Sequence, residues 1–481
     1  MTIPNVGQLT KRGSEKKDID ILMIYPDPQS DSPTRYVPLS ILHPGVFFSD
    51  AYHLRVEYHD CRFESEADLW DKVQRSSCVA VSTYTGKQCL DAVRILKKVK
   101  EFDPEIETAV GGRHAQCASL DIFKESFVDT VFPGTYGDDL SPYNSDTQKY
   151  FRMGEMQLST SFGCCYNCSF CALKSNWIYI SPSQVRSDLY AIHRDIGFKE
   201  ISFTDPNIAC GTIRNSRGSV IRRFDRTELI RTIGKTMRDL QVNWDGNIRA
   251  EYCTPEMCQA LQESRCTSIE IGCESGDDDF LKREIHKGYG VKEIKDACQN
   301  FVRYAPGVSV MYSFMHDMPG ETPEMLNRTM DLIDWIHETD SNGRISIYHF
   351  SPYPGTEMYK KAISGYKGYP KFKPPRTMEE WGNLSLMKSP LYWITGLKFR
   401  QDNSRKNFPG EDWSLIKPYI DLAEQKWRDR KVDFFPCREV EDLITYQQEK
   451  RSSVNSVKPD CATCDSASGE CATSCLYREN D

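Results

Sequence analysis

The sequence predicts an α/β protein with an N-terminal doubly wound parallel sheet, a partial (β/α)6 barrel and a mainly helical C-terminal region. Short, nearly continuous apolar runs such as residues 19–25 are typical of buried parallel strands. Amphipathic segments such as residues 88–102 alternate with these runs, which is the pattern of strand–helix–strand units. A chain of 481 residues is long enough for two or three domains.

The first 140 residues are predicted to form a loose arm (1–17) and one α/β domain (18–140). The predicted strands span residues 19–25, 54–58, 78–82, 106–110 and 128–132. A helix over 88–102 ends before Pro104. In such sheets ligands bind at the carboxyl ends of the strands. The polar stretch 141–155, with Pro and Asn, is predicted to be a linker.

Residues 156–360 are predicted to form the partial barrel. Its strands are expected at residues 156–161, 200–203, 243–248, 268–272, 308–315 and 345–350. The second unit shows clear helix signals, because Ser181 and Pro182 suit the N-cap and N1 positions and Gly197 suits the C-terminal end. Reactive groups are expected at the carboxyl ends of these strands.

Composition narrows the class of protein. A net charge of −8 argues against a protein that follows nucleic-acid phosphates, which needs a basic stripe. There is no apolar run long enough to span a membrane and no apolar core of a secretory signal at the start. Nineteen cysteines, an odd number, favour reduced thiols and metal sites over a disulfide framework. We expect a cytoplasmic protein in an anaerobic or low-oxygen setting.

One short loop carries the strongest chemical signal. Cys164, Cys168 and Cys171 have the spacing C-x3-C-x2-C. Three thiolates on one loop can hold three irons of a 4Fe-4S cluster and leave the fourth iron open. The alternatives are three small buried residues or a zinc loop, but zinc needs a fourth ligand at short spacing and none is near.

This loop resembles the signature of the radical S-adenosylmethionine (radical SAM) superfamily, in which an aromatic residue such as Phe170 precedes the last cysteine. The resemblance implies that the open iron chelates SAM, and that an electron from the cluster splits SAM into methionine and a 5′-deoxyadenosyl radical. Cys165 is an additional cysteine, and we interpret it as a packing residue.

The upstream domain resembles the cobalamin-binding domain of cobalamin-dependent radical SAM enzymes. Three successive strands of this domain are followed by S-x-x-T-G, by G-G-x-H and by a single Gly. On physical grounds alone, these residues could also be ordinary turn residues. The resemblance implies cobalamin contacts at Ser82, Thr83, Thr85, Gly86, Gly111, Gly112, His114, Gly134 and Tyr136. The chain lacks the D-x-H-x-x-G motif whose histidine binds cobalt, so no histidine is expected on the lower face of the cobalt. The family's usual Gly-Glu-Gly-Glu is also absent after the fifth strand.

Several strand ends of the barrel resemble SAM-binding motifs of the same family. The resemblance implies SAM contacts at Phe170, Asp205, Arg249, Glu274 and Tyr353. The alternative for each charged residue is a solvated group at a loop end. No catalytic residue is assigned.

The last 120 residues carry no motif of this kind. Residues 361–450 are expected to form a helical cap over the barrel. The polar tail 451–481 holds four cysteines, which suit zinc or a second Fe-S cluster, although free thiols are the alternative: Cys461, Cys464, Cys471 and Cys475.

The resemblance implies a C-methyltransferase that moves a methyl group from methylcobalamin to an unactivated sp3 carbon. The substrate could be a small molecule, a peptide or a protein, and the reductant a flavodoxin- or ferredoxin-type electron donor. The alternatives are a non-methylating enzyme of the same family, such as an oxidative cyclase or ring-contracting enzyme, and an Fe-S redox sensor or scaffold without turnover. No nucleic-acid or membrane partner is expected.

Overall fold

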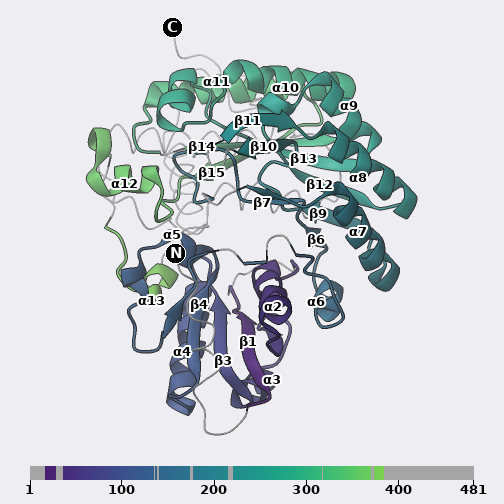
Figure 1. Ribbon diagram of the computed structural model, residues 1–481. Helices are drawn as coiled ribbons and strands as arrows, with labels where there is room; N and C mark the ends of the chain where they lie inside the picture. Colours follow the sequence, from purple (N-terminus) through teal and green to yellow (C-terminus); the bar gives the residue numbers. More distant parts are fainter. Residues whose placement is uncertain are drawn as a thin grey trace, which may run out of the picture. The chain divides into compact units, whose positions relative to one another are not determined.

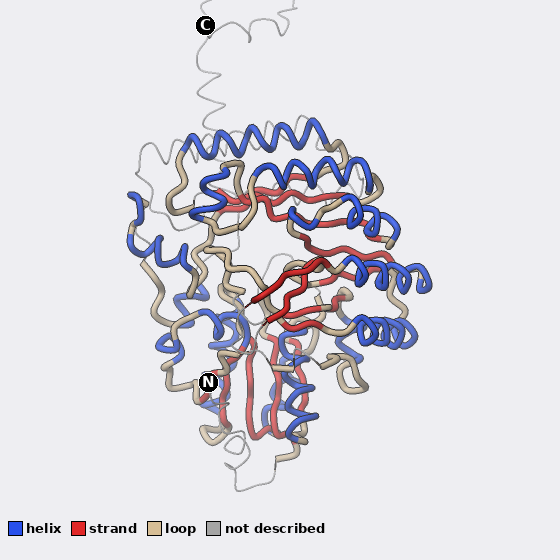
Figure 2. The backbone as a smooth tube through the Cα atoms, turned by 45° about the horizontal axis from the view of Figure 1, so that its top comes forward, coloured by secondary structure: helices blue, strands red, loops and turns tan. Residues whose placement is uncertain are grey.

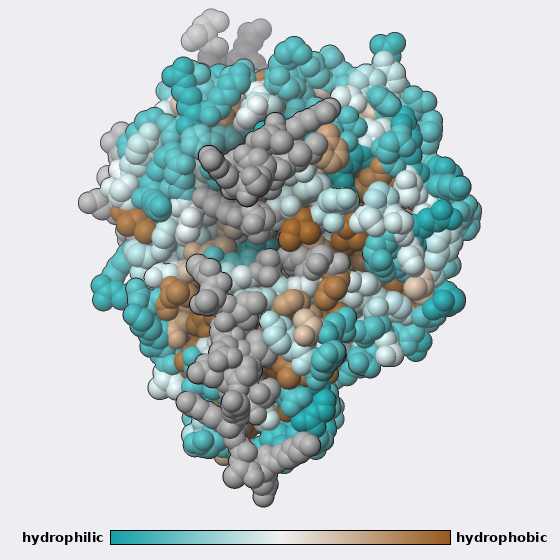
Figure 3. Space-filling view, viewed as in Figure 1, coloured by the Kyte–Doolittle hydropathy of each residue, from teal (hydrophilic) through white to brown (hydrophobic). Residues whose placement is uncertain are grey.

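The computed structural model describes residues 17–28, 36–134, 136–137, 140–173, 177–214, 220–316, 318–369 and 373–383. They build two parallel sheets, one of five strands and one of six, with two small antiparallel ribbons (Figure 1). Hydrophilic residues cover most of the face shown in Figure 3, and hydrophobic ones gather across its middle. Within these described residues, no helix is both long and apolar enough to cross a membrane.

The N-terminal sheet has the strand order β2-β1-β3-β4-β5, and all its pairs are parallel. Its strands are β1 (Ile19–Tyr25), β2 (Val56–Asp60), β3 (Ser76–Ser82), β4 (Glu107–Gly111) and β5 (Thr130–Val131). Its helices are α2 (Leu39–Tyr52), α3 (Glu66–Gln74), α4 (Gln88–Phe102) and α5 (Gly112–Cys117). The chain order reverses between β1 and β3, which opens a crevice at their carboxyl ends.

The six-stranded sheet has the order β15-β14-β13-β12-β9-β6, again parallel throughout. Its strands are β6 (Gln157–Leu158), β9 (Glu200–Phe203), β12 (Asn243–Ile248), β13 (Cys266–Glu274), β14 (Ser309–His316) and β15 (Arg344–His349). Its helices are α7 (Pro182–Ile196), α8 (Thr227–Leu240), α9 (Pro255–Glu263), α10 (Val291–Tyr304) and α11 (Pro323–Thr339). Figure 2 shows these helices on the outer side of the curved sheet.

Burial along β13 shows that one face of the six-stranded sheet is apolar and the other is polar. Ile269, Ile271 and Cys273 are fully buried, whereas Ser268 and Glu270, which alternate with them, are half-buried. Because side chains alternate along a strand, the apolar set packs under the helices and the polar set lines the inner face. The predicted α/β class with two parallel sheets is thus confirmed.

Two local features differ from the predictions. The single strand expected over 156–161 is split into β6 and β7 (Ser161–Phe162), and β7 pairs antiparallel with β8 (Ile178–Tyr179). A ribbon of β10 (Cys210–Arg214) and β11 (Val220–Asp225), which was not predicted, follows β9. Two-residue strands are too short for an alternating pattern to reveal them, and pairing with distant segments decides where they form.

The C-terminal part of the described chain returns to the N-terminal sheet. After α12 (Glu357–Ser364), helix α13 (Met378–Asn383) packs on α4, where Trp381 is fully buried and Glu379 pairs with Lys97 at 3.1 Å. The rest of the predicted cap and the four tail cysteines lie outside the described residues, and the domain boundaries stay predictions. The remaining short helices are α6 (Gln148–Met153) and single turns at Leu120–Phe123, Ala250–Tyr252, Phe280–Glu284 and Tyr366–Gly368.

Candidate functional site

The loop with the three cysteines begins directly after β7. Gly163, with φ +71°, makes the turn, and a conformation of this kind favours glycine. The loop is fixed to the segment after β13 through Ser169, whose N–H donates to the Ile285 carbonyl at 2.8 Å and whose hydroxyl donates to the Glu284 carbonyl at 2.6 Å. The cysteine loop is therefore held from two sides.

The three cysteines fit a cluster site by their proximity and surroundings. Burial, together with the neighbouring Cys168 and Cys164, raises the pKa of Cys171 to about 11 in the metal-free thiol form. The N–H of Leu173 donates to the Cys171 sulfur at 3.4 Å, and Arg249 Nη1 donates to the Cys168 sulfur at 3.6 Å. Donors of this kind stabilise thiolate ligands of Fe-S clusters.

A site for a single metal ion has different requirements. No three His, Cys, Asp or Glu side chains in the described part of the chain form a group that could hold one ion. A cluster does not require such convergence, because each thiolate binds a different iron.

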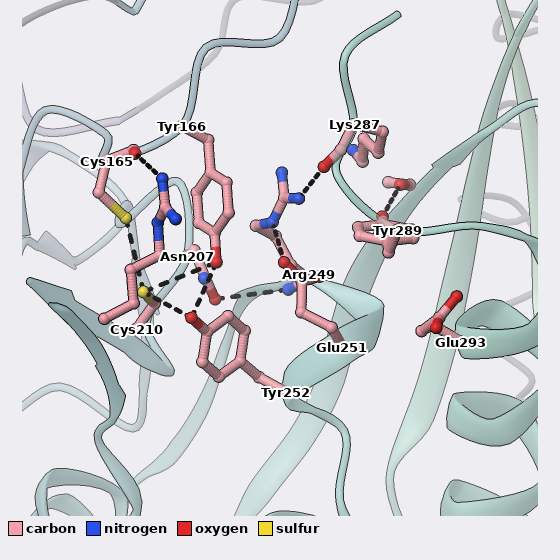
Figure 4. A network of polar contacts seen from close by, with 12 residues as sticks. Cys165, Tyr166, Asn207, Cys210, Arg249, Glu251, Tyr252, Lys287, Tyr289 and Glu293 are labelled. Atoms are coloured by element: carbon pink, nitrogen blue, oxygen red, sulfur yellow. Dashed lines mark hydrogen bonds and ion pairs between the residues drawn. The ribbon is translucent and has the colours of Figure 1, made fainter. Parts of the chain in front are cut away.

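Arg249 lies at the centre of the polar network beside this loop (Figure 4). Its guanidinium stacks on the ring of Tyr166, 3.5 Å from the centroid, and lies 4.9 Å from that of Tyr289. It also pairs with Glu251 at 2.8 Å and donates to the carbonyl of Lys287. With 6% of its surface exposed, Arg249 has a fixed orientation, and its contact with SAM stays a prediction.

Glu274 ends β13 and forms a buried ion pair with Lys287, 2.6 Å apart. Burial lowers the pKa of Lys287, but the charges of Glu274, Tyr289 and Cys168 together outweigh this effect, so the pKa lies above its ordinary value. The backbone of Glu274 has φ +66°, which is unusual for a residue other than glycine and occurs preferentially at functional sites. A positive and a negative group are thus fixed together at a strand end of the barrel.

Asp205 is fully buried, and its oxygens already have partners. They accept hydrogen bonds from the N–H of Thr160 at 2.8 Å, from its hydroxyl at 2.7 Å and from the Ser161 hydroxyl. Arg226 lies 3.6 Å away. Asp205 therefore positions the strand that leads into the cysteine loop, and direct contact with SAM is still a prediction.

Phe170 and Tyr353 lie at two edges of the barrel site. The ammonium of Lys287 is 6.0 Å from the centre of the Phe170 ring. The ring of Tyr353 contacts that of Tyr84, which follows β3 of the N-terminal sheet, with 6.4 Å between centroids. Tyr353 thus belongs to the contact between the barrel and the N-terminal sheet.

A cavity of about 480 Å³ lies at the carboxyl ends of β1 and β3. Six of the nine residues predicted to bind cobalamin line it: Ser82, Thr83, Gly111, Gly112, Gly134 and Tyr136. Residues next to the cysteine loop line the same cavity: Ser159, Ser161, Phe162, Gly163 and Leu173. One cavity therefore borders both the crevice of the N-terminal sheet and the start of the cysteine loop.

The other three predicted residues do not line this cavity. Thr85 and His114 contact each other, with 2.9 Å between Oγ1 and Nδ1, and the His114 ring lies 5.5 Å from those of Phe123 and Trp381. Gly86 has φ +117° in the turn before α4. Thr85 and His114 thus have partners within the protein, and their contact with cobalamin stays a prediction.

Sequence patterns missed several residues of the site. Lys287, Tyr166, Tyr252 and Cys210 belong to no motif, although all belong to the network around Arg249 (Figure 4). A lysine buried to 5% exposure is a strong functional signal, but burial cannot be seen in the sequence.

Comparisons with known proteins agree with this geometry. Residues 158–333 match the model of the Radical SAM superfamily. The tRNA-2-methylthio-N(6)-dimethylallyladenosine synthase of Corynebacterium diphtheriae is 24% identical over 62% of the chain and 61% of the relative. The uncharacterized methyltransferase PH0819 of Pyrococcus horikoshii is 26% identical over 43% of the chain and 41% of the relative. The chain thus spans about three fifths or less of the length of these relatives.

Two solved structures share the fold. The radical SAM methyltransferase TsrM from Kitasatospora setae, with cobalamin and a 4Fe-4S cluster bound, has a TM-score of 0.55 and 14% identity over 75% of this chain and 84% of that one. The cobalamin-dependent SAM radical enzyme OxsB, with aqua-cobalamin bound, has a TM-score of 0.59 and 13% identity over 90% and 75%.

The fold and the cysteine loop together define the class: the chain contains a radical SAM domain, at residues 158–333. Such a domain implies a 4Fe-4S cluster and SAM. Over 75% and 90% of its length, respectively, the chain shares its fold with TsrM and OxsB.

Proposed function

We propose that the protein is a cobalamin-dependent radical SAM methyltransferase that moves a methyl group from methylcobalamin to an unactivated sp3 carbon of a small molecule, peptide or protein. The observation that carries the proposal is the cavity shared by the crevice of the N-terminal sheet and the start of the cysteine loop. When bound, the cluster and SAM supply a carbon-centred radical, and the cobalamin supplies the methyl group.

The cavity has the chemistry that a corrin needs. Apolar side chains such as Phe48 and Phe132 line it together with hydroxyls and amides, among them Ser82, Thr83 and Gln116. A corrin presents an apolar ring with amide side chains at its edge, which hydroxyl and amide groups can bind. Gly112, with φ +86°, lets the ends of β3 and β4 approach closely at the rim, because a Cβ there would lie 2.7 Å from the Thr83 backbone. The apolar lining and the set of hydroxyl and amide groups therefore fit a corrin.

Residues of the barrel would hold the cluster and bind SAM. Cys164, Cys168 and Cys171 would hold the cluster, and Arg249 orients Cys168 through its hydrogen bond. Lys287 and Glu274 offer a cation and an anion beside the loop for the amino acid end of SAM. Arg249, Glu274 and Lys287 are buried, which limits the access of water to this side of the loop.

A methylthiotransferase is the second candidate, favoured by the names of relatives such as the Corynebacterium diphtheriae synthase. Product mass separates the two: methylation adds CH2 to the substrate, whereas methylthiolation adds CH2S. The test is anaerobic incubation of cobalamin-loaded protein with methyl-deuterated SAM and candidate substrates, followed by mass spectrometry. Deuterated methyl on carbon supports the proposal, and sulfur in the product or independence from cobalamin contradicts it.

A further inference from the structure

Two thiols outside the three-cysteine motif lie in contact. The sulfur atoms of Cys165, in the cysteine loop, and Cys210, at the start of β10, are 3.5 Å apart (Figure 4). Both side chains are buried, with exposures of 8% and 1%. The two segments are 45 residues apart in sequence, so this contact is made by the fold and not by a local motif.

The surroundings make Cys210 the more reactive of the two. Its sulfur is hydrogen bonded to the Tyr252 hydroxyl at 3.0 Å, and the Tyr166 hydroxyl lies 3.9 Å away. Hydrogen bonds with Cys165 and with these two phenols lower the pKa of Cys210 to about 7, against the effect of burial. The thiolate is the nucleophilic form of cysteine, and a second thiol beside it can resolve an oxidised sulfur.

We propose that Cys165 and Cys210 form a dithiol site of oxidative modification, at which a peroxide converts the pair to a disulfide that ties the cysteine loop to β10. This site is separate from the three cluster cysteines and does not depend on the proposed cobalamin chemistry. The oxidant is hydrogen peroxide, which is nearly as small as water and can reach a pair with little exposure.

The chemistry balances in two steps. The Cys210 thiolate attacks one peroxide oxygen, the O–O bond breaks, and a sulfenic acid forms while hydroxide leaves and is protonated to water. The Cys165 sulfur then attacks the sulfenic sulfur, the S–S bond forms and the S–O bond breaks, and the Cys165 proton leaves with hydroxide as a second water. The two thiols lose two electrons, which the peroxide gains.

The pair also contacts the cluster region through a short chain of side chains. Tyr252 accepts a hydrogen bond from Tyr166 at 2.8 Å, and Tyr166 stacks on Arg249, which donates to Cys168. Oxidation of Cys210 would therefore take place next to the side chains that orient the cluster ligand Cys168.

The test uses the full-length, cluster-loaded protein, treated anaerobically with limiting hydrogen peroxide, quenched with catalase, alkylated under denaturing conditions and mapped by mass spectrometry without reduction. We expect a peptide pair linked between Cys165 and Cys210, with a mass loss of two hydrogens. The internal reference is Cys117, a half-buried thiol whose sulfur donates to the Ala172 carbonyl at 3.5 Å. If Cys165 and Cys210 are still alkylated once Cys117 is oxidised, or are linked to the cluster cysteines instead, the proposal is wrong.

Serine variants test the two roles. In C165S, oxidation should stop at a sulfenic acid on Cys210, which dimedone traps, and no linked peptide should form. In C210S, Cys165 should stay reduced. The control is C78S, a buried cysteine of β3, which should give the wild-type yield of linked peptide. A dimedone adduct on Cys165 in C210S would overturn the assignment of Cys210 as the attacking thiolate.

Discussion

Arg249 and Cys168 are joined by a hydrogen bond from the guanidinium Nη1 to the sulfur, 3.6 Å long. The two residues are 81 positions apart in sequence, at the end of β12 and in the cysteine loop. Glu251 and the ring of Tyr166 hold the guanidinium in place. Because Arg249 is permanently charged, it contributes a fixed positive field next to a thiolate that is expected to bind iron.

Replacing Arg249 by glutamine should lower the reduction potential of the cluster, because a donor that stabilises the reduced, more negative form is lost. A hydrogen bond to a charged group is worth about 1.5–3 kcal/mol, which corresponds to about 60–130 mV for a one-electron couple. A redox titration followed by electron paramagnetic resonance measures the shift. Arg283→Gln, at an exposed arginine, is the matched control and should leave the potential unchanged. Equal potentials in R249Q and wild type would contradict the role given to Arg249.

Replacing Cys168 by alanine should abolish SAM cleavage and remove the cluster. Cys168 is absent from the lining of the shared cavity, so bound cobalamin should be retained. The measurements are iron content, 5′-deoxyadenosine formation and the cobalamin spectrum of the same sample. Cys165→Ala, which changes a cysteine outside the motif, should keep its iron. Formation of 5′-deoxyadenosine by C168A would refute the cluster assignment.

Two adjacent glycines provide a test of the cavity. At Gly112, with φ +86°, a Cβ would lie 2.7 Å from backbone atoms of Thr83, whereas at Gly111 the nearest atom would be 3.8 Å away, on Phe132. Gly112→Ala should therefore destabilise the fold by about 1–3 kcal/mol and weaken cobalamin binding. Gly111→Ala should leave the stability close to that of the wild type, because its Cβ would make only an ordinary van der Waals contact. Denaturant unfolding and cobalamin titration distinguish them, and equal behaviour of the two variants would contradict the described geometry.

Removing one partner of the buried ion pair between Glu274 and Lys287 should strongly lower the stability of the fold. Lys287→Met leaves a buried carboxylate without its cation, which costs about 3–5 kcal/mol, and the double variant with Glu274→Gln should recover part of this stability. The raised pKa of Lys287 gives stability that is complete below the unfolded lysine pKa of about 10.4 and is lost as the pH rises through the folded value. The stability difference between wild type and K287M should therefore be constant near neutral pH and shrink only in alkaline solution.

Patterns that belong to one segment of chain could be predicted from the sequence. The strand Ile19–Tyr25 and the helix Gln88–Phe102 have the predicted bounds, because a continuous apolar run and a 3.6-residue period are local signals. The three cysteines were found by spacing, and the loop glycines by their place after strands. Six of the nine residues predicted for cobalamin line one cavity for the same reason.

Properties that arise from packing could not be predicted in this way. The contact of Cys165 with Cys210 and the ion pair of Lys287 with Glu274 join segments that only the fold brings together. The ribbon of β10 and β11 depends on its own pairing and on contact with the cysteine loop, where Arg223 donates to the Cys165 carbonyl at 3.0 Å. Burial, which gives Asp205 and His114 their structural partners, has no signature in residue type alone.

We propose that one chain holds both a radical SAM cluster and a cobalamin. The most direct measurement is the ultraviolet-visible spectrum of protein purified anaerobically from cobalamin-fed cells, together with iron and cobalt counts per chain. We predict a cobalamin spectrum, about one cobalt and about four irons from the cysteine loop. Iron without cobalt would leave the radical SAM domain intact and contradict the proposed methyl transfer from cobalamin.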